Sequence, residues 1–166
     1  MKASLSTLSA ALGALCVPLT IATAACAQDN PSSALESDYY LDAPQTPGTW
    51  QYVDEPAESL GLFGVPDRAL PFIIRCDKRT GQVGLARRTA RQGPLTMVVQ
   101  AETTTRQLVA NSVEGAGLVA AELAPDDPLL DAIAITKGRF AIEVEGEEAL
   151  YIPAWAEVSR VIEDCR

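Results

Sequence analysis

Histidine is absent from the 166 residues, and this limits the chemistry that the side chains can do. Without histidine the chain has no Ser-His-Asp or Cys-His nucleophile, no histidine-ligated zinc and no usual general base. Hard oxygen chemistry remains, carried by two acidic groups. Their residues are Asp126, Asp127 and Asp131 in the first group, and Glu143, Glu145, Glu147 and Glu148 in the second.

The positions of these acids favour structural roles over catalysis. The aspartates stand at the predicted start of a helix, where acids cap the backbone and complement its dipole, and their spacing matches no EF-hand calcium loop. The glutamates surround the tip of a predicted hairpin, whereas glycosidase-type chemistry needs two carboxylates in a cleft. The sequence therefore predicts no catalytic residue, no metal site and no cofactor. A carboxylate-dependent hydrolase is the least favoured alternative.

Six basic residues crowd one stretch of an otherwise acidic chain. With 13 Lys and Arg against 22 Asp and Glu, the net charge is −9, which disfavours nucleic acid as a partner and favours a basic one. The stretch is predicted either as a solvated hairpin or as an anion-binding patch for lipid headgroups or an acidic polymer. Its residues are Arg75, Lys78, Arg79, Arg87, Arg88 and Arg91.

Residues 1–27 have the order of a secretory signal peptide. Lys2 precedes an apolar stretch, and small residues follow before the polar segment that begins at Gln28. Two ways of processing stay open: cleavage before Gln28, or lipidation of Cys26 in a loose lipobox. Cleavage gives an exported periplasmic protein whose net charge falls from −9 to −10 with the loss of Lys2. Lipidation gives a protein attached to the membrane through Cys26.

The cysteines predict one covalent constraint. Cys16 leaves with the signal and Cys26 is removed or acylated, so Cys76 and Cys165 remain as an even pair in an oxidising compartment. We expect them to form a disulfide. A bridge closing a loop of this size stabilises the fold by about 4–5 kcal/mol in the chain-entropy treatment.

After the signal, the sequence predicts a flexible polar tether over residues 28–48 and a single globular domain over 49–166. Period-two apolar patterns predict about five or six strands, among them PFIIRC with Cys76 on its inner face. The glycines and the proline of SLGLFGVPDRA, in contrast, indicate an irregular loop. The fold class is therefore α+β, with a mainly antiparallel β-sheet.

Two helices are predicted around the last hairpin. The segment PDDPLLDAIAITKG has an Asp-Pro start and a Lys-Gly end, as expected of a short helix. The C-terminal helix is predicted to begin at Pro153 and to be stapled to the sheet by the disulfide. Its inner stripe is predicted to contain Trp155, Val158, Ile162 and Cys165.

Two stretches, IIRCDKRTGQVGLAR and DPLLDAIAITKGRFAIEVEG through LYIPAWAEVSRVIEDCR, resemble a group of uncharacterised exported bacterial proteins. Their layout also resembles the invasion-associated locus B type of periplasmic domain. The shared features are a leading signal, a strand cysteine and an ending of small helix, two strands, helix and cysteine. The resemblance covers roughly residues 71–88 and 127–166, and it implies no catalytic residues.

These observations favour a non-enzymatic protein of the cell envelope, periplasmic or lipid-anchored, that binds another protein or an envelope component. The alternative is an inhibitor of a basic secreted enzyme, such as a lysozyme or a protease, because the acidic net charge suits such a partner.

Overall fold

The computed structural model describes residues 39–166, and in this part the chain forms nine strands and three helices. The predicted signal peptide, Cys26 and residues 28–38 of the predicted tether lie outside the described residues. The helices are α2 (Tyr39–Asp42), α3 (Pro128–Ile135) and α4 (Ala156–Glu163). The strands are β1 (Thr49–Asp54), β2 (Glu58–Gly64), β3 (Phe72–Asp77), β4 (Gln82–Arg88), β5 (Leu95–Ala101), β6 (Thr104–Val113), β7 (Leu118–Leu123), β8 (Arg139–Val144) and β9 (Leu150–Pro153).

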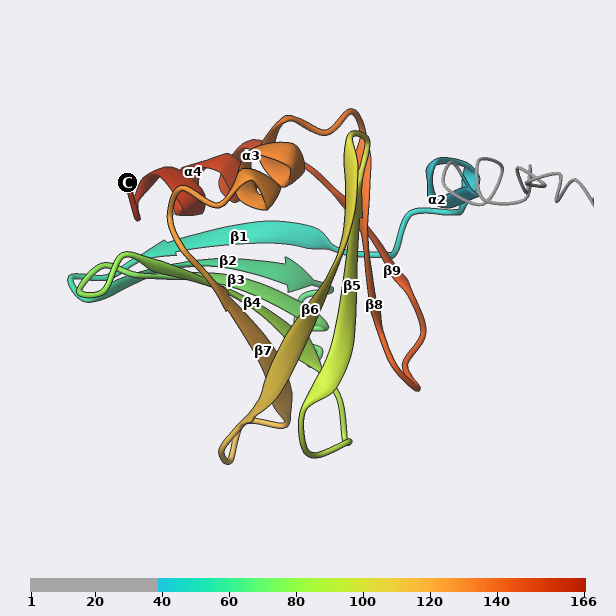
Figure 1. Cartoon of the computed structure of the whole chain (residues 1–166), viewed down its shortest axis with the longest axis horizontal. Helices are drawn as coiled ribbons and strands as arrows, with labels where there is room; N and C mark the ends of the chain where they lie inside the picture. Colours follow the sequence, from blue (N-terminus) through green and yellow to red (C-terminus); the bar gives the residue numbers. More distant parts are fainter. Residues whose placement is uncertain (1–38) are drawn as a thin grey trace, which may run out of the picture. The chain divides into compact units, whose positions relative to one another are not determined.

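All nine strands of the described chain join one antiparallel sheet in the order β1-β2-β3-β4-β7-β6-β5-β8-β9. The long strand β6 links the two halves, because residues 104–110 pair with β5 and residues 111–113 pair with β7. The sheet curves into a half-barrel, with β1–β4 on one side and β5, β8 and β9 on the other (Figure 1). The α+β class with a mainly antiparallel sheet is confirmed.

The helices α3 and α4 lie on the inner face of the half-barrel, where α4 contacts β1, β2 and β3. Alternation along β3 turns Phe72, Ile74 and Cys76 inward, as the period of PFIIRC predicts. The Phe72 ring lies 6.3 Å from Trp50 of β1 and 6.1 Å from Phe140 of β8, so aromatic packing joins both halves of the sheet.

The prediction of an irregular loop over SLGLFGVPDRA is wrong for its first part, because residues 58–64 form strand β2. Gly61 misled the prediction, but its lack of a side chain has a packing reason. A Cβ atom at residue 61 would lie 3.3 Å from the indole of Trp50. Phe63 of the same strand is fully buried, so the inner face of β2 belongs to the core. The irregular loop begins only after Gly64.

The C-terminal helix begins later than predicted. Pro153 ends β9, Trp155 has an extended backbone at the N-cap, and α4 starts at Ala156. The indole of Trp155 is consequently 43% exposed, so its predicted place in the inner stripe is wrong. The buried face of α4 is formed by Val158, Val161 and Ile162.

The two outer strands of the sheet approach each other. Trp50 Nε1 of β1 donates to the carbonyl oxygen of Pro153 in β9 at 2.8 Å. Before β1, the amide of Thr46 donates to the Tyr151 carbonyl at 3.0 Å, and the Tyr151 amide donates to Thr46 Oγ1 at 2.8 Å. The end of the predicted tether is therefore hydrogen-bonded to β9 rather than free of the domain.

Candidate functional site

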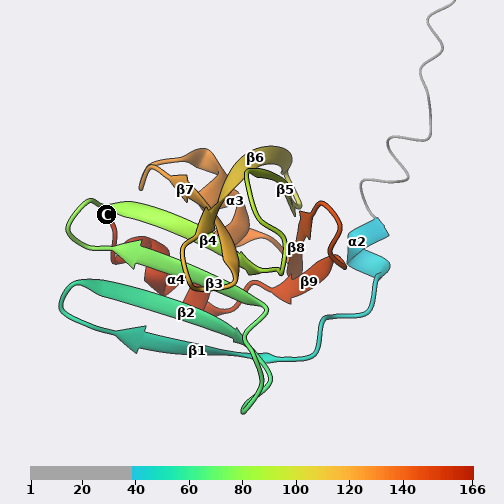
Figure 2. The ribbon, with the colours of Figure 1, turned by 90° about the horizontal axis from the view of Figure 1, so that it is seen from below.

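Cys76 and Cys165 form the predicted disulfide, with Cα atoms 5.6 Å apart and a sequence separation of 89. Cys76 is fully buried at the end of β3, and Cys165 follows α4, where its amide donates to the Ile162 carbonyl at 3.2 Å. The bridge fastens the C-terminus beside the turn that joins β3 and β4 (Figure 2). A disulfide of this kind is typical of proteins from a non-reducing compartment.

The six basic residues of the predicted patch lie in two groups, because β4 separates them. Three precede β4 and flank the β3–β4 turn, which we call the turn end. The other three lie at or beyond the C-terminal end of β4, which we call the Arg87 end. A strand of seven residues such as β4 spans roughly 20 Å, so the six cations do not form one continuous patch.

Acidic side chains neutralise every cation of the turn end. Arg75 pairs with Glu58, and its second guanidinium contact is with Asp77 at 3.6 Å. Lys78 pairs with Asp54, while Arg79 lies 3.9 Å from Asp77. Pairs of this kind at the surface are typical of a solvated hairpin, the first of the two predicted interpretations.

The Arg87 end has a different electrostatic environment. Arg91 makes an ion pair with Glu145 at 3.7 Å, and Arg88 Nε donates to the Leu70 carbonyl at 2.9 Å. Arg87 is only 7% exposed, and among residues 39–166 it is the single charged side chain that is buried. Burial lowers the pKa of the Arg87 guanidinium, and the charges of Glu147 and Glu148 oppose this shift.

The phase of β4 explains why Arg87 is buried. Arg87 is paired with the inward Phe72 of β3 and follows Val83 and Leu85 at alternate positions, all of which face the core. In the sequence, charge alone groups Arg87 with its basic neighbours. Its period-two phase with Val83 and Leu85 was the signal that could have set it apart.

A pocket of about 410 Å³ adjoins Arg87, and we call it the Arg87 pocket. The segment that precedes β1 forms one wall, and the beginning of β9 forms the other. Apolar and polar side chains both line these walls, and the apolar share is the larger. The lining residues are Pro44, Gln45, Thr46, Pro47, Arg87, Glu148, Ala149, Leu150 and Tyr151.

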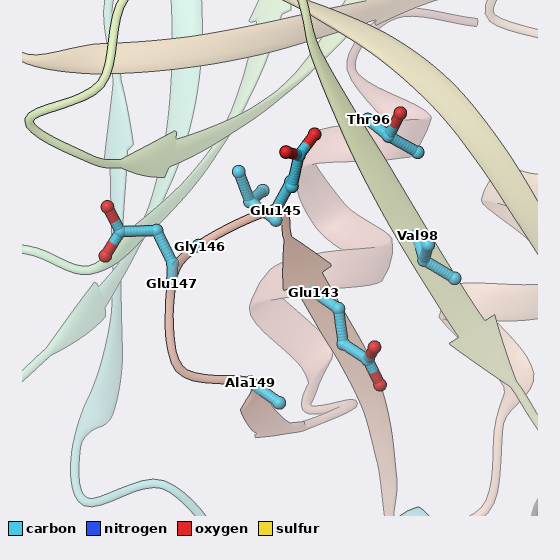
Figure 3. A pocket seen from close by; sticks show the side chains of 8 residues that line it. Thr96, Val98, Glu143, Glu145, Gly146, Glu147 and Ala149 are labelled. Atoms are coloured by element: carbon cyan, nitrogen blue, oxygen red, sulfur yellow. The ribbon is translucent and has the colours of Figure 1, made fainter.

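The glutamates of the last hairpin do not converge. Glu143, Glu145 and Glu147 line a second pocket of about 410 Å³, but their carboxylates point in different directions (Figure 3). Within the described part of the chain, no three side chains of the His, Cys, Asp and Glu types gather where they could hold a metal ion. Two carboxylates aimed at one bond are therefore not provided by this hairpin.

Asp127 and Asp131 have structural partners around α3, and the cap at Asp127 is as the sequence predicts. Asp127 is the N-cap of α3, where its carboxylate accepts from the Leu129 amide at 2.8 Å and pairs with Arg106. Asp131 makes an ion pair with Arg166 at 2.7 Å. Burial raises the pKa of Asp127, but the hydrogen bonds from Arg106 and Leu129 outweigh it and the net pKa is lowered.

The outer face of β5, β6 and the first half of β7 has no charged side chain. Alternation places ten residues on this face, and cross-strand register brings them side by side. Among them, Val109 is 68% exposed and Val113 is 39% exposed. We call this surface the uncharged face; its residues are Thr96, Val98, Gln100, Thr105, Gln107, Val109, Asn111, Val113, Leu118 and Ala120.

No family model, curated protein or solved structure matches this chain. Among residues 39–166, no helix has the length and apolar character needed to cross a membrane.

Proposed function

We propose that this protein is a non-enzymatic protein of the cell envelope that binds another protein through the uncharged face. The observation that carries the proposal is the absence of charge from ten neighbouring outward positions in a chain with 21% charged residues. Two charged residues would be expected among ten at that average, and surfaces usually have more. Depletion of charge at the centre of a patch is the compositional feature of protein interfaces.

The rim of the uncharged face has the charge that its centre lacks. Glu143 is paired with Val98 on one side, and Glu122 follows Ala120 at the end of β7 on another. Arg88 of β4 is paired with Leu118 on a third side, so the rim has a cation as well as these two acids. Together with the net charge of −9, the acids favour a partner whose contact surface is uncharged at the centre and mainly basic at the rim.

Location in the envelope is supported by the disulfide and by the order of residues 1–27. Mass spectrometry of the mature N-terminus tests this part of the proposal. A chain that starts at Gln28 is periplasmic, and a chain that starts at an acylated Cys26 is a lipoprotein. An intact Met1 in the cytoplasm contradicts both.

The binding proposal is tested by capture from an envelope extract with three forms of the protein. Wild type is compared with Val109→Glu, which places a charge at the centre of the uncharged face. Ile135→Glu is the matched control, because Ile135 is an apolar residue of α3 with 73% exposure that lies outside this face. We expect one stoichiometric partner that Val109→Glu loses at least about tenfold and Ile135→Glu retains.

Both variants should melt at the wild-type temperature, because both side chains are exposed. A partner captured equally by all three forms contradicts the uncharged face as the interface. If the partner is a basic secreted enzyme whose activity falls on binding, the protein is an inhibitor, which is the second candidate favoured by the net charge of −9.

A further inference from the structure

Arg87 differs from the other cations of the described chain in its burial. Arg88 and Arg139 also donate to carbonyl oxygens, but neither of them is buried. The three cations of the turn end, and also Arg91, Arg106, Lys137 and Arg166, each have a carboxylate within ion-pair distance. No ion pair joins Arg87 to an acidic side chain of residues 39–166, although only 7% of it is exposed. A buried charge without a counter-ion is unfavourable, so its retention in a core position needs a reason.

Carbonyl oxygens hold the Arg87 side chain in place. Nη1 donates to the carbonyls of Arg88 at 2.8 Å and Pro71 at 3.3 Å, and Nη2 donates to the carbonyl of Glu148 at 3.1 Å. These bonds use three of the five N–H groups of a guanidinium. Nε is buried and has no hydrogen-bond partner in the structure. The carbonyls orient the group, and no carboxylate of the described residues makes a hydrogen bond to it, so the charges of Glu147 and Glu148 act on it only from a longer distance.

The pocket beside Arg87 has the size and the walls of a small-molecule site. Its volume of about 410 Å³ falls within the range of about 300–1,000 Å³ that is usual for such sites. Pro44 and Pro47 on one side, with Leu150 and Tyr151 on the other, supply apolar surface around two residues of opposite charge, Arg87 and Glu148. The hydrogen bonds between Thr46 and Tyr151 hold the two walls together before any ligand arrives.

We infer that the Arg87 pocket binds a monocarboxylate with a small apolar or aromatic substituent. The guanidinium attracts the carboxylate, and the prolines, Leu150 and Tyr151 contact the substituent. Glu148 lines the same pocket, and the charges of Glu147 and Glu148 act on Arg87, so they repel a phosphate dianion about twice as strongly as a carboxylate monoanion. This site is separate from the uncharged face, so either proposal can fail without the other.

The carboxylate can come from a free acid or from the C-terminus of a peptide, and paired probes distinguish the sources. N-acetylphenylalanine presents the carboxylate and an aromatic ring. Its C-terminal amide, N-acetylphenylalaninamide, has the same ring but a neutral group in place of the carboxylate. Inorganic phosphate tests the preference for a monoanion. A tripeptide ending in phenylalanine that binds at least about tenfold more tightly than N-acetylphenylalanine assigns the site to peptide C-termini, and equal affinity assigns it to free acids.

The experiment is a titration of the full chain, followed by NMR at the Arg87 Nε–H signal and at the Thr46 and Tyr151 amides. N-acetylphenylalanine should shift all three signals saturably, and its amide and phosphate should bind at least about tenfold more weakly. Arg87→Lys should weaken binding at least about tenfold, because a lysine keeps the charge but loses the planar fork. Arg88→Lys is the matched control and should bind like wild type, since Arg88 does not line the pocket.

Equal binding of the acid and its amide, or the absence of any saturable shift in the wild-type chain, overturns the inference. If Arg87→Lys does not fold, the comparison of acid, amide and phosphate on the wild-type chain still decides the question.

Discussion

The two ends of β4 show two ways in which this chain accommodates positive charge. At the turn end, Arg75, Lys78 and Arg79 lie at the surface, and each has an acidic partner. At the other end, Arg87 is buried and bonded only to carbonyl oxygens. The turn end is also where the disulfide ties the C-terminus to β3.

The difference teaches that a run of basic residues in sequence need not be one functional surface. Paired cations at a covalently closed turn are already neutralised, and they have little attraction left for a ligand. An oriented guanidinium without a counter-ion beside a pocket still has that attraction. Changes at the turn end should therefore affect stability, and changes at Arg87 should affect both stability and ligand binding.

The largest expected effect comes from breaking the disulfide at the turn end. Cys165→Ser should lower the free energy of unfolding by about 2–5 kcal/mol, the usual loss in a small secreted domain. Chemical denaturation measures this, and reduction of the wild type should give a similar loss as the control. Amide hydrogen exchange should accelerate around the turn end more than around Arg87. A variant as stable as wild type would contradict the structural role of the bridge.

The second effect concerns the core end of β4. Arg87→Met fills similar space but removes three hydrogen bonds to carbonyl oxygens. Buried acceptors that lose their donors cost about 1–3 kcal/mol, so we expect a loss of that size in denaturation experiments. Arg88→Met, which removes one hydrogen bond to the Leu70 carbonyl, should lower the free energy of unfolding by less. A more stable Arg87→Met protein would mean that the burial of the charge outweighs its bonds.

The structure of the turn end could be predicted from the sequence better than the structure of the Arg87 end. The phase of PFIIRC placed Cys76 inward, and cysteine counting then fixed its partner, because both signals are local or arithmetic. The burial of Arg87 could have been predicted only by giving its position in the strand alternation more weight than its charge. The Arg87 pocket could not be predicted, since it forms between residues 44–47 and β9, which lie about a hundred residues apart.

Two further features, Gly61 in a strand and the uncharged face, depend on tertiary contacts and could not be predicted from the sequence. The indole of Trp50 accounts for Gly61 in the middle of a strand, and no signal near Gly61 in sequence announces this. The uncharged face likewise depends on register, because Val109 of β6 is paired with Thr96 of β5, and Asn111 with Ala120 of β7. Each strand alone gives only an alternating pattern, and the combined surface exists only once the strand order is known.

Acidification should weaken the turn end selectively. Burial raises the pKa of Asp77, but the amides of Thr80 and Arg79 and the charges of Arg79 and Arg75 outweigh it, and the net pKa lies below the ordinary value of 3.8. A lowered folded-state pKa contributes stability above the unfolded value, and this contribution is lost as the pH falls through the folded value. At the other end, the hydrogen-bond partners of Arg87 are carbonyls, which do not titrate, and the carboxylates of Glu147 and Glu148 act on it without an ion pair.

An NMR titration from about pH 6 to about pH 2 tests this contrast. The Arg79 and Thr80 amides, which lie 3.0 and 3.1 Å from Asp77 Oδ1, should shift below about pH 4, and the Arg87 Nε–H signal should move less. Asp77→Asn should abolish the acid shift of the two amides. An equal response at both ends of β4 would show that their electrostatic environments do not differ as described.

The smallest effect is expected at the most exposed cation. The side chain of Arg79 is 80% exposed and lies 3.9 Å from Asp77, so solvent screens the pair and the long side chain loses entropy in forming it. Arg79→Ala should change the free energy of unfolding by less than about 0.5 kcal/mol in denaturation experiments. Arg75→Ala is the comparison, because Arg75 is half-buried and contacts both Glu58 and Asp77, and it should cost more. If Arg79→Ala lowers the free energy of unfolding as much as Arg87→Met does, then the ion pairs of the turn end are not weak and screened. The contrast between the turn end and the Arg87 end would then be wrong.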